Sequence, residues 1–78
     1  MSIQERTIGE KLRILRKEYQ ISLREIASDL YISLASISRN ERDDGEITVA
    51  RLQIYCDYYG LSLKDFFDNT YWDEERYK

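Results

Sequence analysis

The sequence predicts an all-α protein, a compact five-helix bundle in a single domain. The chain has 78 residues, no proline and only three glycines. Apolar residues recur at intervals of three and four, which is the spacing of a helix face. A serine or threonine that can cap a helix N-terminus precedes each of these apolar stripes. A chain of this length buries a modest core, so we expect one domain.

The first helix is expected to begin after Thr7. Glu10 follows three residues later, and together the two residues have the pattern of a capping box. The apolar residues that follow share one helical face: Ile8, Leu12, Leu15 and Tyr19.

Residues 22–41 predict two short helices joined by a tight turn. Ser22 and Glu25 again have the pattern of a capping box, and the stripe of that helix is formed by Ile26, Ala27 and Leu30. Ser33 is a second N-cap directly afterwards, and Ile37 is the inward anchor of the next helix. Helices this short are unstable alone. We therefore expect them to pack around the small Ala27 as a helix-turn-helix.

The second half of the chain predicts two further helices and a tail. Thr48 caps the fourth helix after a polar turn at 43–46, Gly60 ends it, and Ser62 caps the fifth. The side chains expected inside are Val49, Leu52, Tyr55, Cys56, Tyr59, Leu63, Phe66 and Phe67. These elements place a helix-turn-helix domain at 1–68 and a polar, aromatic tail at 69–78. Thr70 is the candidate cap of a short sixth helix in that tail.

Composition argues against several classes of function. The chain has no histidine, and it contains no nucleophile elbow, glycine-rich phosphate loop or metal-ligand cluster. We therefore expect no enzyme activity, cofactor, metal or small-molecule ligand. A single cysteine, no apolar run of membrane-spanning length and no signal-peptide pattern favour the cytoplasm and exclude the membrane.

Net charge works against nucleic-acid binding, because it is −3 and such domains usually run basic. The distribution of these charges along the chain weakens this argument against nucleic-acid binding. Residues 1–50 carry eight basic and nine acidic side chains, whereas residues 51–78 carry four and six. The acidic excess therefore lies largely in the second half.

Four segments resemble a known family: IGEKLRILRKE, SLREIASDL, YISLASISRNE and GLSLKDFF. In this order and spacing, residues 7–67 are similar to XRE-type, phage-repressor-like helix-turn-helix regulators. The resemblance implies a dimer on a palindromic double-stranded DNA operator, with the third helix in the major groove. Four positions depart from the family pattern. Leu23 replaces a glutamine that touches the DNA backbone, Tyr31 a turn glycine, Asn40 a large apolar residue, and Ile47 a proline.

The resemblance also implies which residues read the DNA bases. On the third helix these positions are held by Leu34, Ala35 and Arg39, with Ser38 on the same face. Arginine makes bidentate contacts to guanine, and small apolar side chains meet the thymine methyl group. We therefore expect a half-site with a guanine beside one or two thymines.

Other positions are expected to hold the domain on the DNA or to hold it together. The candidates for phosphate contact are Ser22, Leu23, Arg24, Ser36 and Arg42, although the acidic 43–46 turn lies next to them. In the family, the positions of Arg16 and Glu41 form a buried ion pair. Cys56 is expected to be a small buried hydrophobic residue.

The aromatic tail leaves two alternatives open. Tyr71, Trp72 and Tyr77 either fold back on the bundle or form a dimer interface with the fifth helix, and we favour the interface. Its candidate residues are Phe66, Phe67, Tyr71 and Trp72. Otherwise the tail is disordered and the chain is part of a longer regulator.

Two functions fit this sequence. The first is a sequence-specific transcriptional regulator, a repressor or a controller-type protein, acting as a homodimer. The alternative is a protein-interaction module on the same fold, such as an antitoxin or a partner of another regulator. Leu23, Leu34, the acidic balance and the aromatic tail favour this alternative.

Overall fold

The computed structural model describes residues 6–72, which form helices and the turns between them. Tyr77, one of the aromatic residues of the tail, lies outside these described residues. The α-helices are α1 (Ile8–Glu18), α2 (Leu23–Leu30), α3 (Leu34–Glu41), α4 (Val49–Tyr59) and α5 (Leu63–Phe66), followed by a 3-10 helix, η1 (Asn69–Trp72). The all-α, five-helix architecture is confirmed.

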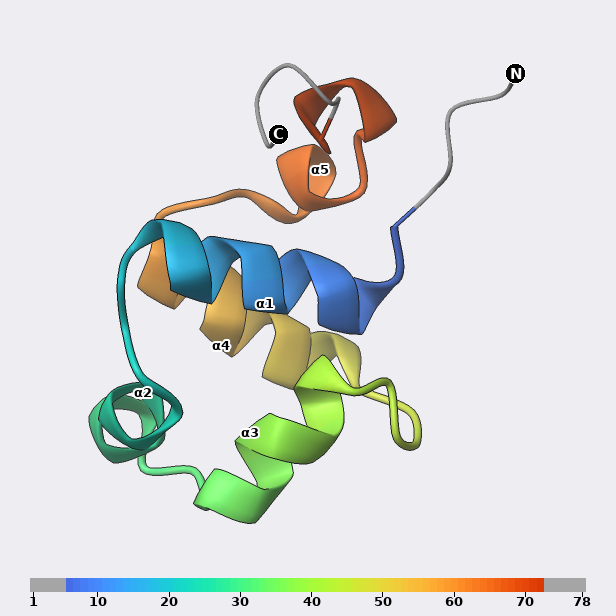
Figure 1. Cartoon of the computed structure of the whole chain (residues 1–78). Coiled ribbons are helices and arrows are strands. Elements are labelled where there is room, and N and C mark those ends of the chain that lie inside the picture. Colours follow the sequence, from blue (N-terminus) through green and yellow to red (C-terminus); the bar gives the residue numbers. More distant parts are fainter. Residues whose placement is uncertain (1–5, 73–78) are drawn as a thin grey trace.

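The helices divide the molecule into two ends (Figure 1). α1 crosses the middle, and α4 lies behind it in this view. α2 and α3 form one end, where α3 packs against both α1 and α2. α5 and η1 pack on each other at the opposite end, beyond α1. The α2–α3 pair is therefore separated by α1 and α4 from the C-terminal turn, which is formed by α5 and η1.

Every α-helix begins at the predicted cap. At α1 the Thr7 hydroxyl accepts a 3.1 Å hydrogen bond from the Glu10 amide, and the Glu10 carboxylate accepts a 2.8 Å bond from the Thr7 amide. Four further hydroxyls accept a bond from the amide three residues ahead, and they belong to Ser22, Ser33, Thr48 and Ser62. At Ser22 only this half of the predicted capping box is formed among the described residues.

The core is built from the inward faces of all five α-helices. Its buried members are Leu12, Leu15, Ile26, Ala27, Ile37, Leu52, Tyr55, Cys56, Tyr59, Leu61, Phe66 and Trp72. Cys56 is fully buried, and burial raises the pKa of its thiol to about 11. It is the small core residue that the sequence predicted.

Three predicted core positions are wrong. Val49, Tyr19 and Phe67 are 71%, 50% and 55% exposed. Each lies at a helix end: Val49 is the first residue of α4, and Tyr19 and Phe67 are the C-caps of α1 and α5. At these three helix ends the side chain lies beyond the core, whereas Tyr59 and Phe66, the last residues of α4 and α5, are buried.

The C-terminal turn corrects two further expectations. Trp72 is buried against Phe66, and its indole N–H donates a 2.8 Å bond to the Phe66 carbonyl. Phe66 is thus the core residue that the sequence predicted, Trp72 folds back on the bundle, and neither is a surface candidate for a dimer, which leaves Phe67 exposed and Tyr71 half-buried. Thr70 does not cap the sixth helix. Asp68 does, because its carboxylate accepts bonds from the Thr70 amide and hydroxyl at 3.0 and 2.7 Å.

The buried Lys11 joins this turn to α1. Its ammonium donates a 2.9 Å hydrogen bond to the Phe66 carbonyl and lies 5.3 Å from the centre of the Phe66 ring. Across residues 6–72, no helix combines the length and the apolar character that a bilayer crossing requires.

Candidate nucleic-acid interface

One side of α3 packs against the bundle, and its other side is exposed to solvent. Ile37 is fully buried and Glu41 nearly so. Leu34, the first residue of α3, is 41% exposed, and Ala35 and Arg39, which point away from Ile37, are exposed as well. Ser38 is half-buried at the edge of this face. The structure thus brings Leu34, Ala35 and Arg39 together on one surface, with Ser38 beside it.

The turn that presents α3 is tight and strained. Tyr31 ends α2 in the left-handed conformation, with φ of 56°, and its side chain is 96% exposed. The Ile32 amide donates a 3.1 Å bond back to the Ala27 carbonyl, which closes the end of α2. The turn thus takes the positive φ that a glycine would normally supply.

The expected ion pair between α1 and α3 is present. Arg16 Nε donates to Glu41 Oε2 at 2.8 Å, and Arg16 Nη2 donates to Glu41 Oε1 at 3.1 Å. A third bond, from Arg16 Nη1 to the Ile21 carbonyl at 2.9 Å, fixes the chain entering α2. The hydrogen bond to Glu41 raises the pKa of Arg16. The pair therefore fixes the orientation of α3 relative to α1.

A second link between α1 and α3 was missed by the sequence reasoning. The Asp43 carboxylate accepts bonds from the Thr7 hydroxyl at 2.6 Å and from the Gly9 amide at 2.8 Å. A Cβ on Gly9 would lie 2.6 Å from the Glu41 carbonyl oxygen, so only glycine allows this approach. Gly9 lies in one of the four segments that resemble the family, and this was the available signal in the sequence. Its partner Asp43 lies 34 residues away, so local spacing could not predict the contact.

Asn40, one of the departures from the family pattern, has a defined role. Its Oδ1 accepts a 2.7 Å bond from the Tyr55 hydroxyl and a 3.3 Å bond from Arg51. Both donors lie on α4, so a polar side chain here ties the end of α3 to the helix behind it. Burial raises the pKa of Tyr55 to about 12, which keeps its hydroxyl a donor.

The five candidate phosphate contacts lie on α2 and α3 or at the caps of these helices. Ser22 caps α2, whose first amides have no intrahelical acceptor and suit an anion. The neighbouring Leu23 side chain is half-buried against the core, and Arg24 is exposed. Ser36 accepts a 2.9 Å bond from the Ser33 hydroxyl, which leaves its own O–H able to donate.

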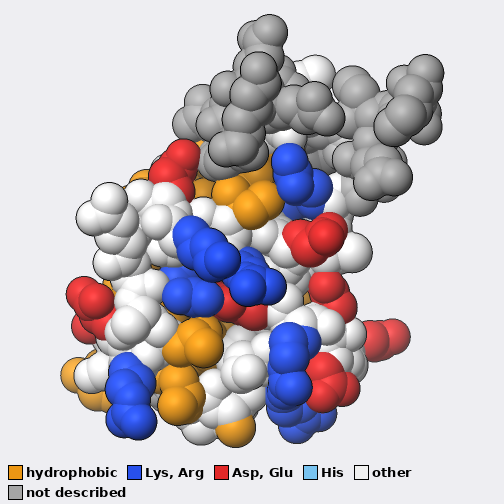
Figure 2. Space-filling model, viewed as in Figure 1, with side chains coloured by type: hydrophobic (Ala, Val, Ile, Leu, Met, Phe, Trp, Pro, Cys, Tyr) orange, Lys and Arg blue, Asp and Glu red, His pale blue; other side chains and the backbone are white. Residues whose placement is uncertain are grey.

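Arg42, the fifth candidate, is exposed but does not stand alone. Its guanidinium and that of Arg39 both lie against Asp44, at 4.0 and 3.8 Å. Figure 2 shows basic side chains on either side of hydrophobic ones over α2 and α3, with acidic side chains against the group near the end of α3. The sequence reasoning named the turn as acidic, but it did not pair it with these arginines.

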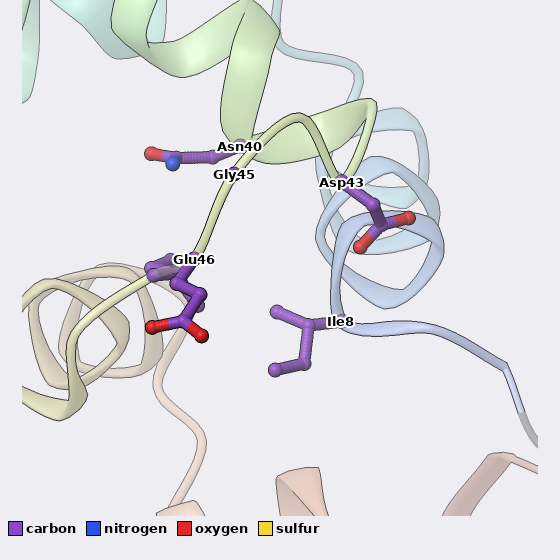
Figure 3. Close-up of a pocket in the computed structure, with 6 residues that line it drawn as sticks. Ile8, Asn40, Asp43, Gly45 and Glu46 are labelled. Carbon is purple, nitrogen blue, oxygen red and sulfur yellow. The ribbon is translucent and has the colours of Figure 1, made fainter.

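A small pocket lies beside this turn (Figure 3). It has a volume of about 250 Å³ and is lined by Ile8, Asn40, Asp43, Gly45, Glu46 and Ile47. The side-chain oxygens of Asn40 and Asp43 already accept hydrogen bonds from within the fold. Within residues 6–72 no three potential metal ligands gather, here or elsewhere. The exposed face of α3 is therefore the better candidate site.

Comparison with known proteins agrees with this geometry. A helix-turn-helix family model matches residues 12–66, which is most of the chain. No curated protein and no solved structure matches the chain. The matched region spans the Arg16–Glu41 pair, the turn at Tyr31 and the whole exposed face of α3. The chain belongs to the XRE-type helix-turn-helix family, whose members are DNA-binding regulators.

Proposed function

We propose that this protein is a sequence-specific transcriptional regulator, a repressor or a controller-type protein of the cytoplasm. In this proposal α3 lies in the major groove of double-stranded DNA. The observation that carries it is the exposed group of Leu34, Ala35 and Arg39 on a helix that is fixed to the bundle by Ile37 and the Arg16–Glu41 pair. A rigidly held helix can place side chains against base edges with the required accuracy.

Each exposed side chain of α3 has a chemical counterpart in the groove. Arg39 suits the O6 and N7 atoms of guanine, and the apolar Leu34 and Ala35 suit thymine methyl groups. Ser38, at the edge of the face, is assigned a supporting base contact. Ser22, Leu23, Arg24, Ser36 and Arg42 are assigned to phosphates on either side of the groove.

We further propose that residues 1–68 form the DNA-binding unit and that the protein acts as a homodimer on a palindromic operator. One helix-turn-helix makes few base contacts, and a dimer doubles them. Phe67, the 55% exposed C-cap of α5, and the half-buried Tyr71 are the remaining candidates for the dimer surface. The test is sedimentation of Phe67→Ser beside Ile54→Ser, an exposed apolar residue on α4. Loss of the dimer in the first variant alone supports the assignment, and equal behaviour of the two rejects it.

The reading of DNA is tested by selection from random duplexes at low salt, with wild type, Arg39→Ala and Lys64→Ala in parallel. Lys64 is an exposed basic residue on α5, at the other end of the bundle. We expect a palindromic motif whose guanine preference disappears only in Arg39→Ala, a loss of about 1–3 kcal/mol of discrimination. A motif that is unchanged in Arg39→Ala removes Arg39 from the base contacts.

The second candidate function is a protein-interaction module, an antitoxin or a partner of another regulator. The observation that favours it is the exposure of Tyr31 at 96% and Leu34 at 41%, two large apolar side chains at the tip of the helix pair. Salt dependence separates the two functions. DNA affinity falls with a slope of about −0.9 per phosphate contacted in a plot of log K against log salt. An apolar protein interface has no such slope.

A further inference from the structure

Asp44 lies against both arginines of the exposed α3 face. Its Oδ2 is 3.8 Å from Arg39 Nε and 4.0 Å from Arg42 Nη2. The three side chains are about equally exposed, at 60% for Asp44, 60% for Arg39 and 64% for Arg42. One carboxylate is thus shared by a proposed base-reading arginine and a proposed phosphate-binding arginine.

The backbone holds Asp44 in this place. Its amide donates a 3.0 Å hydrogen bond to the Arg39 carbonyl, so the residue is fastened to the last turn of α3. The preceding residue, Asp43, takes a positive φ of 57° and is bonded to the start of α1 through Thr7 and Gly9. Asp44 therefore belongs to a turn that is hydrogen-bonded to α3 and α1, and these bonds hold its carboxylate next to the arginines.

Two neighbouring acidic residues, Glu41 and Asp43, have other partners. Glu41 is paired with Arg16 on the buried side of α3, and Asp43 accepts its bonds from α1. Among the described residues, Asp44 alone forms ion pairs with the α3 arginines. Asp44 is thus the carboxylate of the acidic turn that pairs with the two arginines proposed to contact DNA.

We propose that Asp44 is a built-in electrostatic limit on DNA affinity, an inference that rests on the proposed DNA-binding function. A phosphate that reaches Arg42 comes within a few ångströms of the Asp44 carboxylate, where two like charges repel. Arg39 must also leave Asp44 before its guanidinium can reach a guanine. Both effects weaken DNA binding, so Asp44 lowers the affinity of the interface for DNA.

The opposite role predicts the opposite result. If Asp44 served to orient Arg39 toward a base edge, removing its charge would weaken binding to the selected operator. If Asp44 limits affinity, removing its charge strengthens binding. The sign of the change therefore decides between the two roles.

The test compares five proteins: wild type, Asp44→Asn, Asp44→Ser, Asp44→Glu and Asp65→Asn. Asp65 lies on α5, beyond α1 from the α3 face, so its variant changes the net charge by the same amount at a distance. Binding is measured by fluorescence anisotropy across a salt series. The probes are a labelled random-sequence duplex and the duplex recovered by selection.

We expect Asp44→Asn and Asp44→Ser to bind the random-sequence duplex about two- to thirtyfold more tightly than wild type at low salt, from two exposed ion pairs. Their salt slope should steepen by about 0.9 for each additional phosphate contacted. Asp44→Glu and Asp65→Asn should stay close to wild type, because one keeps the local charge and the other removes a remote one.

Two results overturn this proposal. If both neutral Asp44 variants bind like Asp65→Asn, or more weakly than wild type, Asp44 does not limit affinity, while wild-type binding to the selected duplex preserves the proposed function. If neither wild type nor the neutral variants bind either duplex at low salt, the proposed function and this inference fall together.

Discussion

The Gly9 amide donates a 2.8 Å hydrogen bond to the Asp43 carboxylate, which joins the start of α1 to the turn after α3. The approach is so close that a Cβ at position 9 would also meet the Asn40 carbonyl oxygen at 2.8 Å. The end of α3 is therefore pressed onto the backbone of α1. This contact fixes where the exposed α3 face stands relative to the bundle.

Gly9→Ala should destabilise the protein. Alanine favours a helix over glycine by roughly 0.5–1 kcal/mol, so propensity alone predicts a gain. The clash with backbone carbonyls should outweigh it and lower the free energy of unfolding by about 1–3 kcal/mol. Urea denaturation measures the change. Ser28→Ala, at an exposed position of α2, is the control and should stay within about 0.5 kcal/mol. A more stable Gly9→Ala protein would contradict the contact.

Arg16→Ala should be strongly destabilising, because it leaves the Glu41 carboxylate buried without its partner. A loss of about 3–5 kcal/mol in the free energy of unfolding is expected. The double variant Arg16→Leu with Glu41→Leu should recover much of this loss, since no charge is left stranded. Chemical denaturation of the three proteins gives the comparison. A double variant less stable than Arg16→Ala would count against an ion pair.

Two buried tyrosines should respond oppositely to loss of the hydroxyl. The Tyr59 hydroxyl is buried with no hydrogen-bond partner among the described residues, whereas the Tyr55 hydroxyl donates to Asn40 at 2.7 Å. Tyr59→Phe should therefore be neutral or stabilising. Tyr55→Phe should cost about 1–3 kcal/mol, because it removes a partner of the Asn40 oxygen. Thermal and urea unfolding of both variants test this, and an equal loss in the two would contradict it.

Tyr31→Gly should stabilise the fold. Tyr31 has a φ of 56° and its side chain is 96% exposed, so glycine relieves strain and gives up little burial. A non-glycine residue in this conformation is strained by about 1–2 kcal/mol, from which the greater flexibility of glycine in the unfolded chain subtracts. A net gain of about 0.5–1 kcal/mol is expected in the free energy of unfolding. A loss of stability would mean that the tyrosine ring makes contacts of its own.

Stability should decline at alkaline pH. Burial raises the pKa of the Cys56 thiol from 9.0 to about 11 and that of Tyr55 from 10.0 to about 12. The unfolded chain thus releases these protons at lower pH than the folded protein, and folding weakens as pH rises. Their contribution is complete below pH 9 and is lost through about pH 12.

Urea unfolding at a series of alkaline pH values measures this decline. In Cys56→Ala the fall should begin about one pH unit later, because the first group to titrate, with an ordinary pKa of 9.0 against 10.0 for Tyr55, is gone. A pH profile unchanged by the substitution would exclude the thiol as its cause.

Much of the candidate site could be predicted from the sequence because helix capping and helical periodicity are local. Ala35 and Arg39 lie two residues before and two residues after Ile37, the inward anchor of α3, so helical spacing turns them outward. Leu34 lies three residues before Ile37, on the same side of the helix, and is 41% exposed as the first residue of α3. The exposure of Ala35 and Arg39 therefore follows from the sequence. The pairing of Asp44 with Arg39 and Arg42 does not, because it depends on the path of the turn after α3.

The starts of the five α-helices, the all-helical fold and the exposure of Ala35 and Arg39 could be predicted from the sequence, since each depends on residues within one or two helical turns. The bond between Gly9 and Asp43, the burial of Trp72 and the exposure of Val49 depend instead on how the helices pack together. Contacts between distant segments form only when the helices have taken their places. A side chain at a helix end is buried or exposed according to how far its neighbours reach.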